Sequence, residues 1–113
     1  VEGQLEGGIA QGVGYALYER LEINPRSRRT LSSDLLHYRI PQMADMPQTH
    51  VDMVDSYDPY GPLGAKSVGE LATVPVAPAI VNAARRASGR EINSLPLCDR
   101  FVILPSRRKE EDG

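Results

Sequence analysis

The chain has 113 residues, with 13 Lys or Arg against 15 Asp or Glu, so its formal net charge is −2. This balance gives no global attraction to nucleic acid or to an anionic membrane, and we expect neither as a partner. No apolar run approaches the ~18 residues that a membrane-spanning helix needs, and the N-terminus lacks the basic and apolar regions of a signal peptide. We therefore expect a cytoplasmic protein.

Residues 4–20 predict the first helix. Apolar residues fall on one stripe of it, at Leu5, Ile9, Val13, Ala16 and Leu17. The same segment holds four glycines, Gly7, Gly8, Gly12 and Gly14. Each glycine costs a helix about 1 kcal/mol relative to alanine, so this pattern indicates that another group approaches the helix closely. Tight helix packing and contact with a cofactor both satisfy this requirement.

Residues 21–57 predict the strands of a small sheet. Residues 21–23 and 30–31 flank a turn-rich stretch, as in a hairpin. Residues 50–57 alternate apolar and polar side chains over part of their length, which is typical of a half-buried strand.

Residues 61–70 predict a flexible loop that leads into a second helix. Gly61, Gly64 and Gly69 allow a positive φ or a close backbone approach. The helix is indicated by an apolar stripe at Val76, Ile80, Ala83, Ala84 and Ala87. Pro75 and Pro78 are expected in its first turn, and Gly89 is expected at its C-terminal cap.

Glu70 is the candidate catalytic residue, because it lies at the end of this loop and just before the helix. Near the positive end of a helix a carboxylate is stabilised by about 0.3–1 kcal/mol, and this stabilisation alone would account for a glutamate at position 70. The alternative is a general base, which needs a shielded site. Spacing alone leaves both interpretations open.

Together these elements predict an α+β fold with two helices packed on a small mixed sheet. Residues 1–105 are expected to form one domain, and residues 106–113 a disordered tail. The single cysteine, Cys98, excludes an internal disulfide, and we assign it no chemistry. No Cys or His cluster has the spacing of metal ligands, so we expect no side chain to bind a metal.

Three stretches, in the same order, carry a resemblance to a known family. They are QLEGGIAQGVGYAL at residues 4–17, residues 34–47 with YRIP and ADMP, and GAKSVGE at residues 64–70. They resemble segments of the molybdopterin-binding large subunit of the xanthine oxidase and aldehyde oxidase family of molybdenum hydroxylases. The resemblance covers nearly all of residues 1–97 and corresponds to the C-terminal part of a much longer subunit. We therefore expect a fragment of its second molybdenum-binding domain.

The resemblance implies an oxidoreductase that hydroxylates a purine, an N-heterocycle or an aldehyde, with water as the oxygen source. It implies a molybdenum-molybdopterin cofactor, with [2Fe-2S] clusters and FAD on other domains or subunits. The expected partners are the rest of the large subunit, iron-sulfur and FAD subunits and a small-molecule substrate. Leu71 and Ala72 depart from the family pattern, since many relatives carry proline after the Gly-Glu pair.

The resemblance also assigns roles to residues. Glu70 would be the catalytic base, and Gln11 would contact the molybdopterin with Gly12 as the small neighbour that admits it. The remaining cofactor contacts would come mainly from backbone N–H groups of Lys66, Ser67, Val68 and Gly69.

The alternative function is a non-catalytic module. In this hypothesis the chain serves only in folding, oligomerisation or interaction, and exposed apolar helix faces drive self-association. The isolated chain is predicted to be inactive in either case, because most of the cofactor pocket would lie elsewhere.

Overall fold

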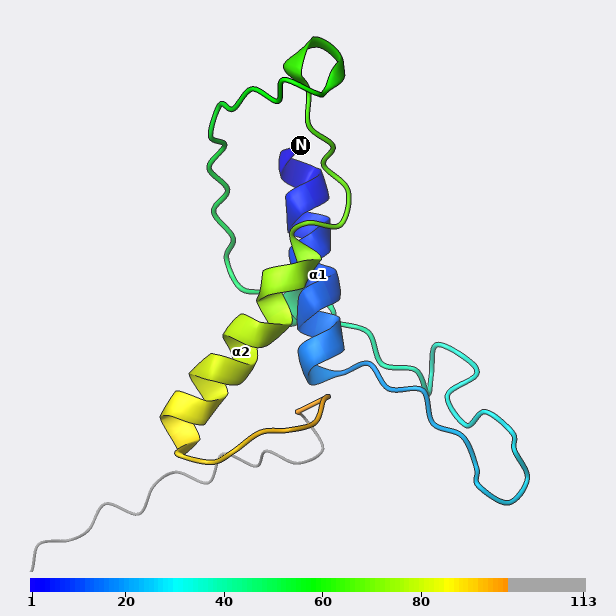
Figure 1. Cartoon of the computed structure of the whole chain (residues 1–113). Helices are drawn as coiled ribbons and strands as arrows, with labels where there is room; N and C mark the ends of the chain where they lie inside the picture. The colour runs from blue at the N-terminus through cyan, green and yellow to red at the C-terminus, as the bar shows by residue number, and fades with distance from the viewer. Residues whose placement is uncertain (98–113) are drawn as a thin grey trace, which may run out of the picture.

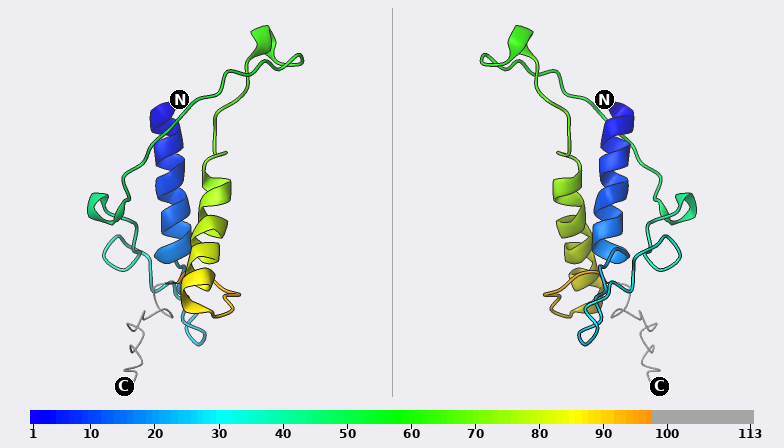
Figure 2. Two further views of the ribbon diagram at one scale, coloured as in Figure 1. Left: turned by 90° about the vertical axis from the view of Figure 1, so that its left-hand side faces the viewer. Right: turned by 90° about the vertical axis from the view of Figure 1, so that its right-hand side faces the viewer.

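The computed structural model describes residues 1–97 and is built around two helices, α1 at Glu2–Leu17 and α2 at Thr73–Ser88. Two short 3-10 turns lie between them, η1 at Met43–Asp45 and η2 at Pro62–Gly64. The helices lie side by side and run in the same direction, and long irregular segments project from the pair at both ends (Figures 1 and 2).

The predicted α+β fold with a mixed sheet is wrong, because residues 1–97 contain no strand. Of the predicted hairpin, a single antiparallel bridge between Ile23 and Thr30 is present. Residues 50–57 are irregular and pair with no strand in the described chain. Alternation predicts an extended backbone, but a strand forms only where a neighbouring strand completes its hydrogen bonds. A single two-stranded hairpin is marginal for the same reason.

Two glycines of α1 form its close contact with α2. A Cβ built on Gly8 would lie 2.8 Å from Cβ of Ala72, and one built on Gly12 would lie 2.5 Å from Cβ of Val76. Both glycines are buried. Since real Cβ atoms do not approach one another so closely, the helices keep this distance only with glycine at both positions. The tight helix packing that the glycines predicted is therefore confirmed for this pair.

Helix α2 ends as predicted but begins differently. Gly89 has a φ of 65° and its N–H donates to the Arg85 carbonyl at 2.9 Å, which confirms the C-terminal cap. Pro75 lies in the first turn, since α2 begins at Thr73. Pro78 lies inside the helix, so placing it in the first turn was wrong. Its missing N–H leaves one carbonyl of the preceding turn without its usual partner.

The core of the described chain is small. Its buried hydrophobic residues are Val13, Ala16, Ala77, Ile92 and Leu97. The backbone N–H of Leu97 donates to the carbonyl of Ala16 at 2.8 Å, which fixes the segment after α2 against the end of α1. Within residues 1–97, neither helix has the length and apolar character needed to cross a bilayer. The tail expected at 106–113 and Cys98 lie outside the described residues.

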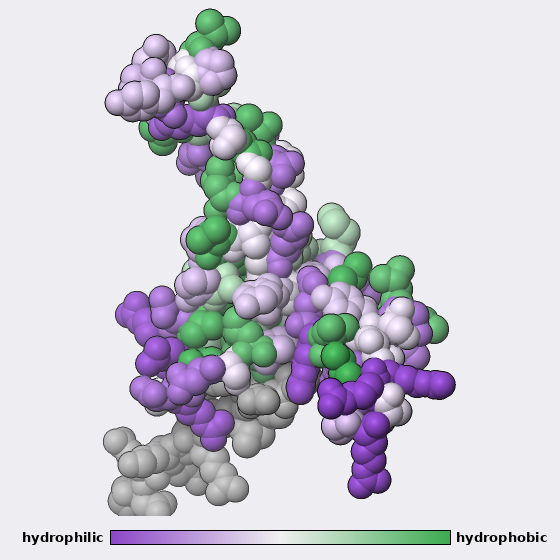
Figure 3. Space-filling model, turned by 45° about the vertical axis from the view of Figure 1, so that its right-hand side comes forward, coloured by the Kyte–Doolittle hydropathy of each residue, from purple (hydrophilic) through white to green (hydrophobic). Residues whose placement is uncertain are grey.

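Large apolar side chains remain at the surface. Leu36 and Met43 are each 90% exposed, and Leu63 is fully exposed. Figure 3 shows hydrophobic residues at several places on one face. One such place is the far end of the projecting segment that connects α1 to α2 in the sequence. So much exposed apolar surface is unusual for a monomeric soluble protein.

Candidate functional site

The candidate site is the loop at residues 66–70, between η2 and α2. Figure 1 shows the chain returning beside the N-terminal half of α1 before α2 begins. Glu70 is exposed, and its carboxylate makes no hydrogen bond or ion pair within residues 1–97. The carboxylate is therefore accessible, and the described residues do not supply the shielded environment that a general base needs.

Two of the three loop glycines are used as predicted. Gly64 has a φ of 81°, in the left-handed region that favours glycine, and a Cβ there would overlap the ring of Tyr57. A Cβ on Gly61 would overlap the carbonyl oxygen of Ala65. These contacts fold the chain tightly just before the 66–70 loop, so the loop starts from a defined turn.

The backbone of the 66–70 loop presents consecutive hydrogen-bond donors. None of the N–H groups of Lys66, Ser67, Val68, Gly69 and Glu70 has an acceptor within residues 1–97. Each free amide can donate to an anion or to an oxygen atom of a cofactor, but none of residues 66–70 has the positive φ that makes successive amides converge in an anion-binding nest. The Lys66 side chain is engaged elsewhere, since its Nζ donates to Ser56 Oγ at 2.9 Å. The expectation that backbone groups carry the contacts is therefore compatible with the structure.

Two glutamines of α1 make hydrogen bonds near Glu70, Gln4 to the loop backbone and Gln11 to the side chain of Thr73. Gln4 Nε2 donates to the carbonyl oxygen of Gly69 at 3.1 Å. Thr73 Oγ1 donates to Gln11 Oε1 at 3.2 Å, and the Thr73 N–H donates to the Glu70 carbonyl at 3.0 Å. The structure thus brings Gln11 close to the 66–70 loop, with its Nε2 donor still unused within residues 1–97. Gly12, in contrast, lies buried beneath Val76 of α2.

Neither Gln4 nor Thr73 was singled out from the sequence. A signal was present, because residues 4, 8 and 11 are spaced so that they share one face of a helix. The structure shows that on this face Gly8 and Gln11 contact the start of α2, whereas Gln4 bonds to the loop.

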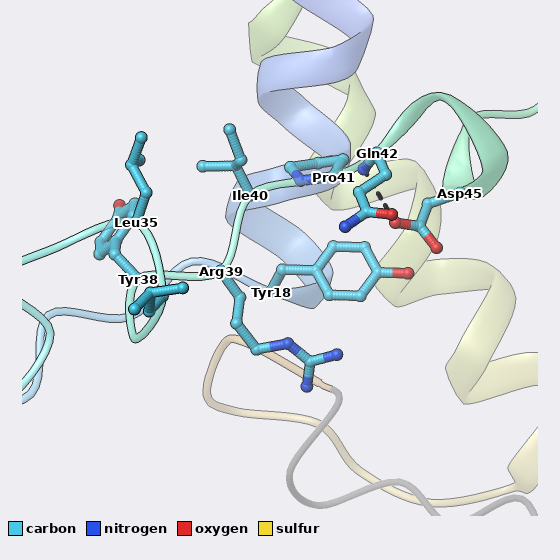
Figure 4. Close-up of a pocket in the computed structure, with 9 residues that line it drawn as sticks. Tyr18, Leu35, Tyr38, Arg39, Ile40, Pro41, Gln42 and Asp45 are labelled. Carbon is cyan, nitrogen blue, oxygen red and sulfur yellow. Dashed lines mark hydrogen bonds between the residues drawn. The ribbon is translucent and has the colours of Figure 1, made fainter.

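A surface hollow of about 480 Å³ lies at the other end of α1. Figure 4 shows Tyr18, Arg39 and Gln42 among its lining residues, with the Arg39 guanidinium 6.0 Å from the centre of the Tyr18 ring. Tyr18 is about 20 Å along α1 from Gln4, given the rise of 1.5 Å per helical residue. The hollow is therefore separate from the 66–70 loop.

No group of three or more His, Cys, Asp or Glu in residues 1–97 is placed to hold a metal ion. The shortest acidic contact with a histidine joins Asp34 Oδ1 and His37 Nδ1 at 2.7 Å. This hydrogen bond lowers the pKa of Asp34. Both side chains are mostly exposed, so the pair stabilises a local turn at the surface.

Tyr38 beside the hollow gives a pH-dependent prediction. Its hydroxyl donates to Glu19 Oε2 at 2.7 Å, and this bond, followed by burial, raises the pKa of Tyr38 above the usual 10.0. The stabilisation is present below pH 10 and is lost as the pH rises through the folded-state pKa. We expect Tyr38→Phe to remove a late-ionising phenol from the ultraviolet pH titration. If the phenol lost in Tyr38→Phe instead ionised with the ordinary tyrosine pKa, the bond would not be formed in solution.

Comparison with known proteins adds independent information about the site. Residues 1–47 match the model of the molybdopterin cofactor-binding domain. The xanthine dehydrogenase molybdenum-binding subunit of Escherichia coli O157:H7 is 43% identical over 110 residues, which are 97% of this chain and 14% of that protein. This chain belongs to the xanthine oxidase family of molybdenum-binding large subunits. The family expected from the sequence is thus confirmed.

Other members of the xanthine oxidase family are also similar to this chain. The aldehyde oxidoreductase molybdenum-binding subunit PaoC of Escherichia coli (strain K12) is 36% identical over 95 residues, covering 83% of this chain and 13% of PaoC. The crystal structure of quinoline 2-oxidoreductase from Pseudomonas putida 86 has a TM-score of 0.77 and 30% identity, covering 86% of this chain and 13% of that one. The chain spans about one seventh of the length of such relatives, whose names indicate different substrates.

Proposed function

We propose that this chain contributes the catalytic base and part of the cofactor site to a molybdenum hydroxylase. The observation that carries the proposal is the 66–70 loop, which presents consecutive free amides and then the accessible carboxylate of Glu70 beside α1. The similarity of the chain to molybdenum-binding subunits supports it. Which of a purine, an N-heterocycle or an aldehyde is the substrate depends on residues outside this chain.

The residues of the loop fit a molybdenum-molybdopterin group, because their amides have no acceptor within residues 1–97 and can donate to its anionic oxygen atoms, and Gln11 Nε2 likewise has no acceptor there. When bound, this cofactor supplies the two-electron oxidation of a substrate carbon. In the proposed reaction, one carboxylate oxygen of Glu70 accepts the proton of the attacking hydroxyl group. The amides at 66–69 hold the cofactor, and the α1 glutamines keep the loop in place.

A substitution can distinguish cofactor contacts made by backbone amides from contacts made by side chains. Val68→Pro removes one N–H donor, and we expect it to weaken cofactor retention about 10- to 100-fold, as for loss of one hydrogen bond to a charged group. Lys66→Ala and Ser67→Ala are the matched controls, and both are expected to retain molybdenum. Metal analysis of the purified full-length enzyme gives the result. Equal molybdenum in Val68→Pro and wild type would contradict the backbone contacts.

The proposal extends to the assembly. The rest of the large subunit would cover the loop and shield Glu70, and iron-sulfur clusters and FAD on other domains or subunits would carry electrons away. We propose a cytoplasmic location for the assembly, without contact to nucleic acid or membrane. Residues 1–105 would remain part of one molybdopterin-binding domain.

The second candidate is an interaction module without catalysis. The observation in its favour is the exposed apolar surface, which includes Leu36, Met43 and Leu63. We expect the isolated chain to be inactive with added cofactor and to self-associate as its concentration rises. Sedimentation at several concentrations measures this, and a constant monomer mass would argue against the second candidate.

A further inference from the structure

The backbone on both sides of Glu70 is held by α1. On one side, the carbonyl of Gly69 accepts the hydrogen bond from Gln4. On the other side, the carbonyl of Glu70 accepts from Thr73, which is itself bound to Gln11. Gln4 and Gln11 are about two helical turns apart, so their side chains leave the same face of α1. Gln4 reaches Gly69 in the loop, and Gln11 reaches Thr73, the first residue of α2.

The Gln4 bond acts directly on the direction of Glu70. The carbonyl of Gly69 and the N–H of Glu70 belong to one planar peptide group. Fixing that carbonyl oxygen therefore fixes the plane from which Glu70 departs. Gly69 has little else to restrain it, because it lacks a side chain and a Cβ built there would meet nothing within 4 Å.

We propose that Gln4 is a positioning residue that aims the Glu70 carboxylate by holding the Gly69–Glu70 peptide group. The inference rests on the proposed role of Glu70 and extends it to a residue that acts through the backbone. Gln11 acts less directly, because it accepts from the hydroxyl of Thr73, whose N–H donates to the Glu70 carbonyl. The glutamine pair thereby compensates for the flexibility that glycine brings to the loop.

Gln4→Met in the full-length enzyme tests this proposal, because Met keeps the length of the side chain and removes the donor. The first readout is hydrogen exchange of the cofactor-free protein. The amide of Thr73, which donates to the Glu70 carbonyl and is the hydrogen-bonded amide among residues 69–73, is expected to exchange about fivefold faster, the effect of losing one neutral hydrogen bond. Amides of residues 80–88, further along α2, are expected to keep their wild-type rates.

The second readout is steady-state kinetics of the loaded enzyme. We expect kcat to fall about 10- to 100-fold, as for a displaced catalytic group, with KM and molybdenum content nearly unchanged. Gln4→Lys places a donor one atom further along the side chain and is expected to recover part of the loss. Gln48→Met, at an exposed glutamine without a hydrogen bond in the described chain, is the matched control and is expected to leave both readouts unchanged.

Unchanged exchange at the Thr73 amide in Gln4→Met would overturn the proposal. A loss of molybdenum that accounts for the whole fall in kcat would also overturn it, because Gln4 would then bind the cofactor itself. Full turnover in Glu70→Gln would refute the proposed function instead. The exchange experiment distinguishes these failures, since it reports the hold on the loop without any turnover.

Discussion

Replacing Glu70 by Gln in the full-length enzyme is expected to lower kcat about 10²- to 10⁴-fold, the usual contribution of a positioned general base. The amide has nearly the same shape as the carboxylate but cannot accept the proton. Molybdenum content is expected to stay at the wild-type level, because cofactor contacts come from backbone amides and not from this side chain. Steady-state turnover and metal analysis of the same preparation measure both quantities.

Glu2→Gln is the matched control for this experiment. Glu2 is exposed in the first turn of α1, so it shares with Glu70 only the favourable position of a carboxylate near a helix N-terminus. We expect it to leave turnover unchanged. If Glu70→Gln had an effect as small as that of Glu2→Gln, Glu70 would be a helix-stabilising residue and the catalytic role would be refuted.

Gly12→Leu is expected to destabilise the helix pair by about 1–3 kcal/mol, the usual cost of overpacking. The first atom of the new side chain would already lie 2.5 Å from Cβ of Val76, so α1 and α2 must separate. Because the 66–70 loop runs directly into α2, cofactor retention should fall as well. The midpoint of urea unfolding and the molybdenum content of the full-length protein measure these effects.

Gly7→Ala provides the matched control on the same helix. A Cβ on Gly7 would meet nothing within 4 Å, so the change adds helix propensity without a clash. We expect a gain of about 0.5–1 kcal/mol. If Gly12→Leu were as stable as Gly7→Ala, the close approach of α1 and α2 would not exist in solution.

The helices could be predicted from the sequence, whereas the sheet could not. Apolar stripes and a terminal glycine are local signals, and both helices form where these signals placed them. The bounds were less exact, since α1 was predicted over residues 4–20 and spans Glu2–Leu17. Strand pairing depends on a neighbouring chain segment, and the sequence of residues 50–57 does not indicate whether such a segment is present. The exposure of Leu36 and Met43 could not be predicted either, because the type of an apolar residue does not indicate whether another segment covers it.

The site was predicted through family motifs more than through periodicity. The motifs indicated the 66–70 loop and Gln11, and the structure brings these together through Thr73. Gln4 was missed because a hydrogen bond to a residue 65 positions away leaves no local pattern. The catalytic role of Glu70 and the cofactor contacts remain predictions that the experiments above address.

A structure of the full-length enzyme with its cofactor would test the central claim most directly. We expect N–H groups of residues 66–69 to lie within hydrogen-bonding distance of the cofactor. We also expect the Glu70 carboxylate to lie within about 3.2 Å of the attacking oxygen or to reach it through one bridging water molecule. A Glu70 side chain that faces bulk solvent, with the cofactor out of reach of the loop, would contradict that claim.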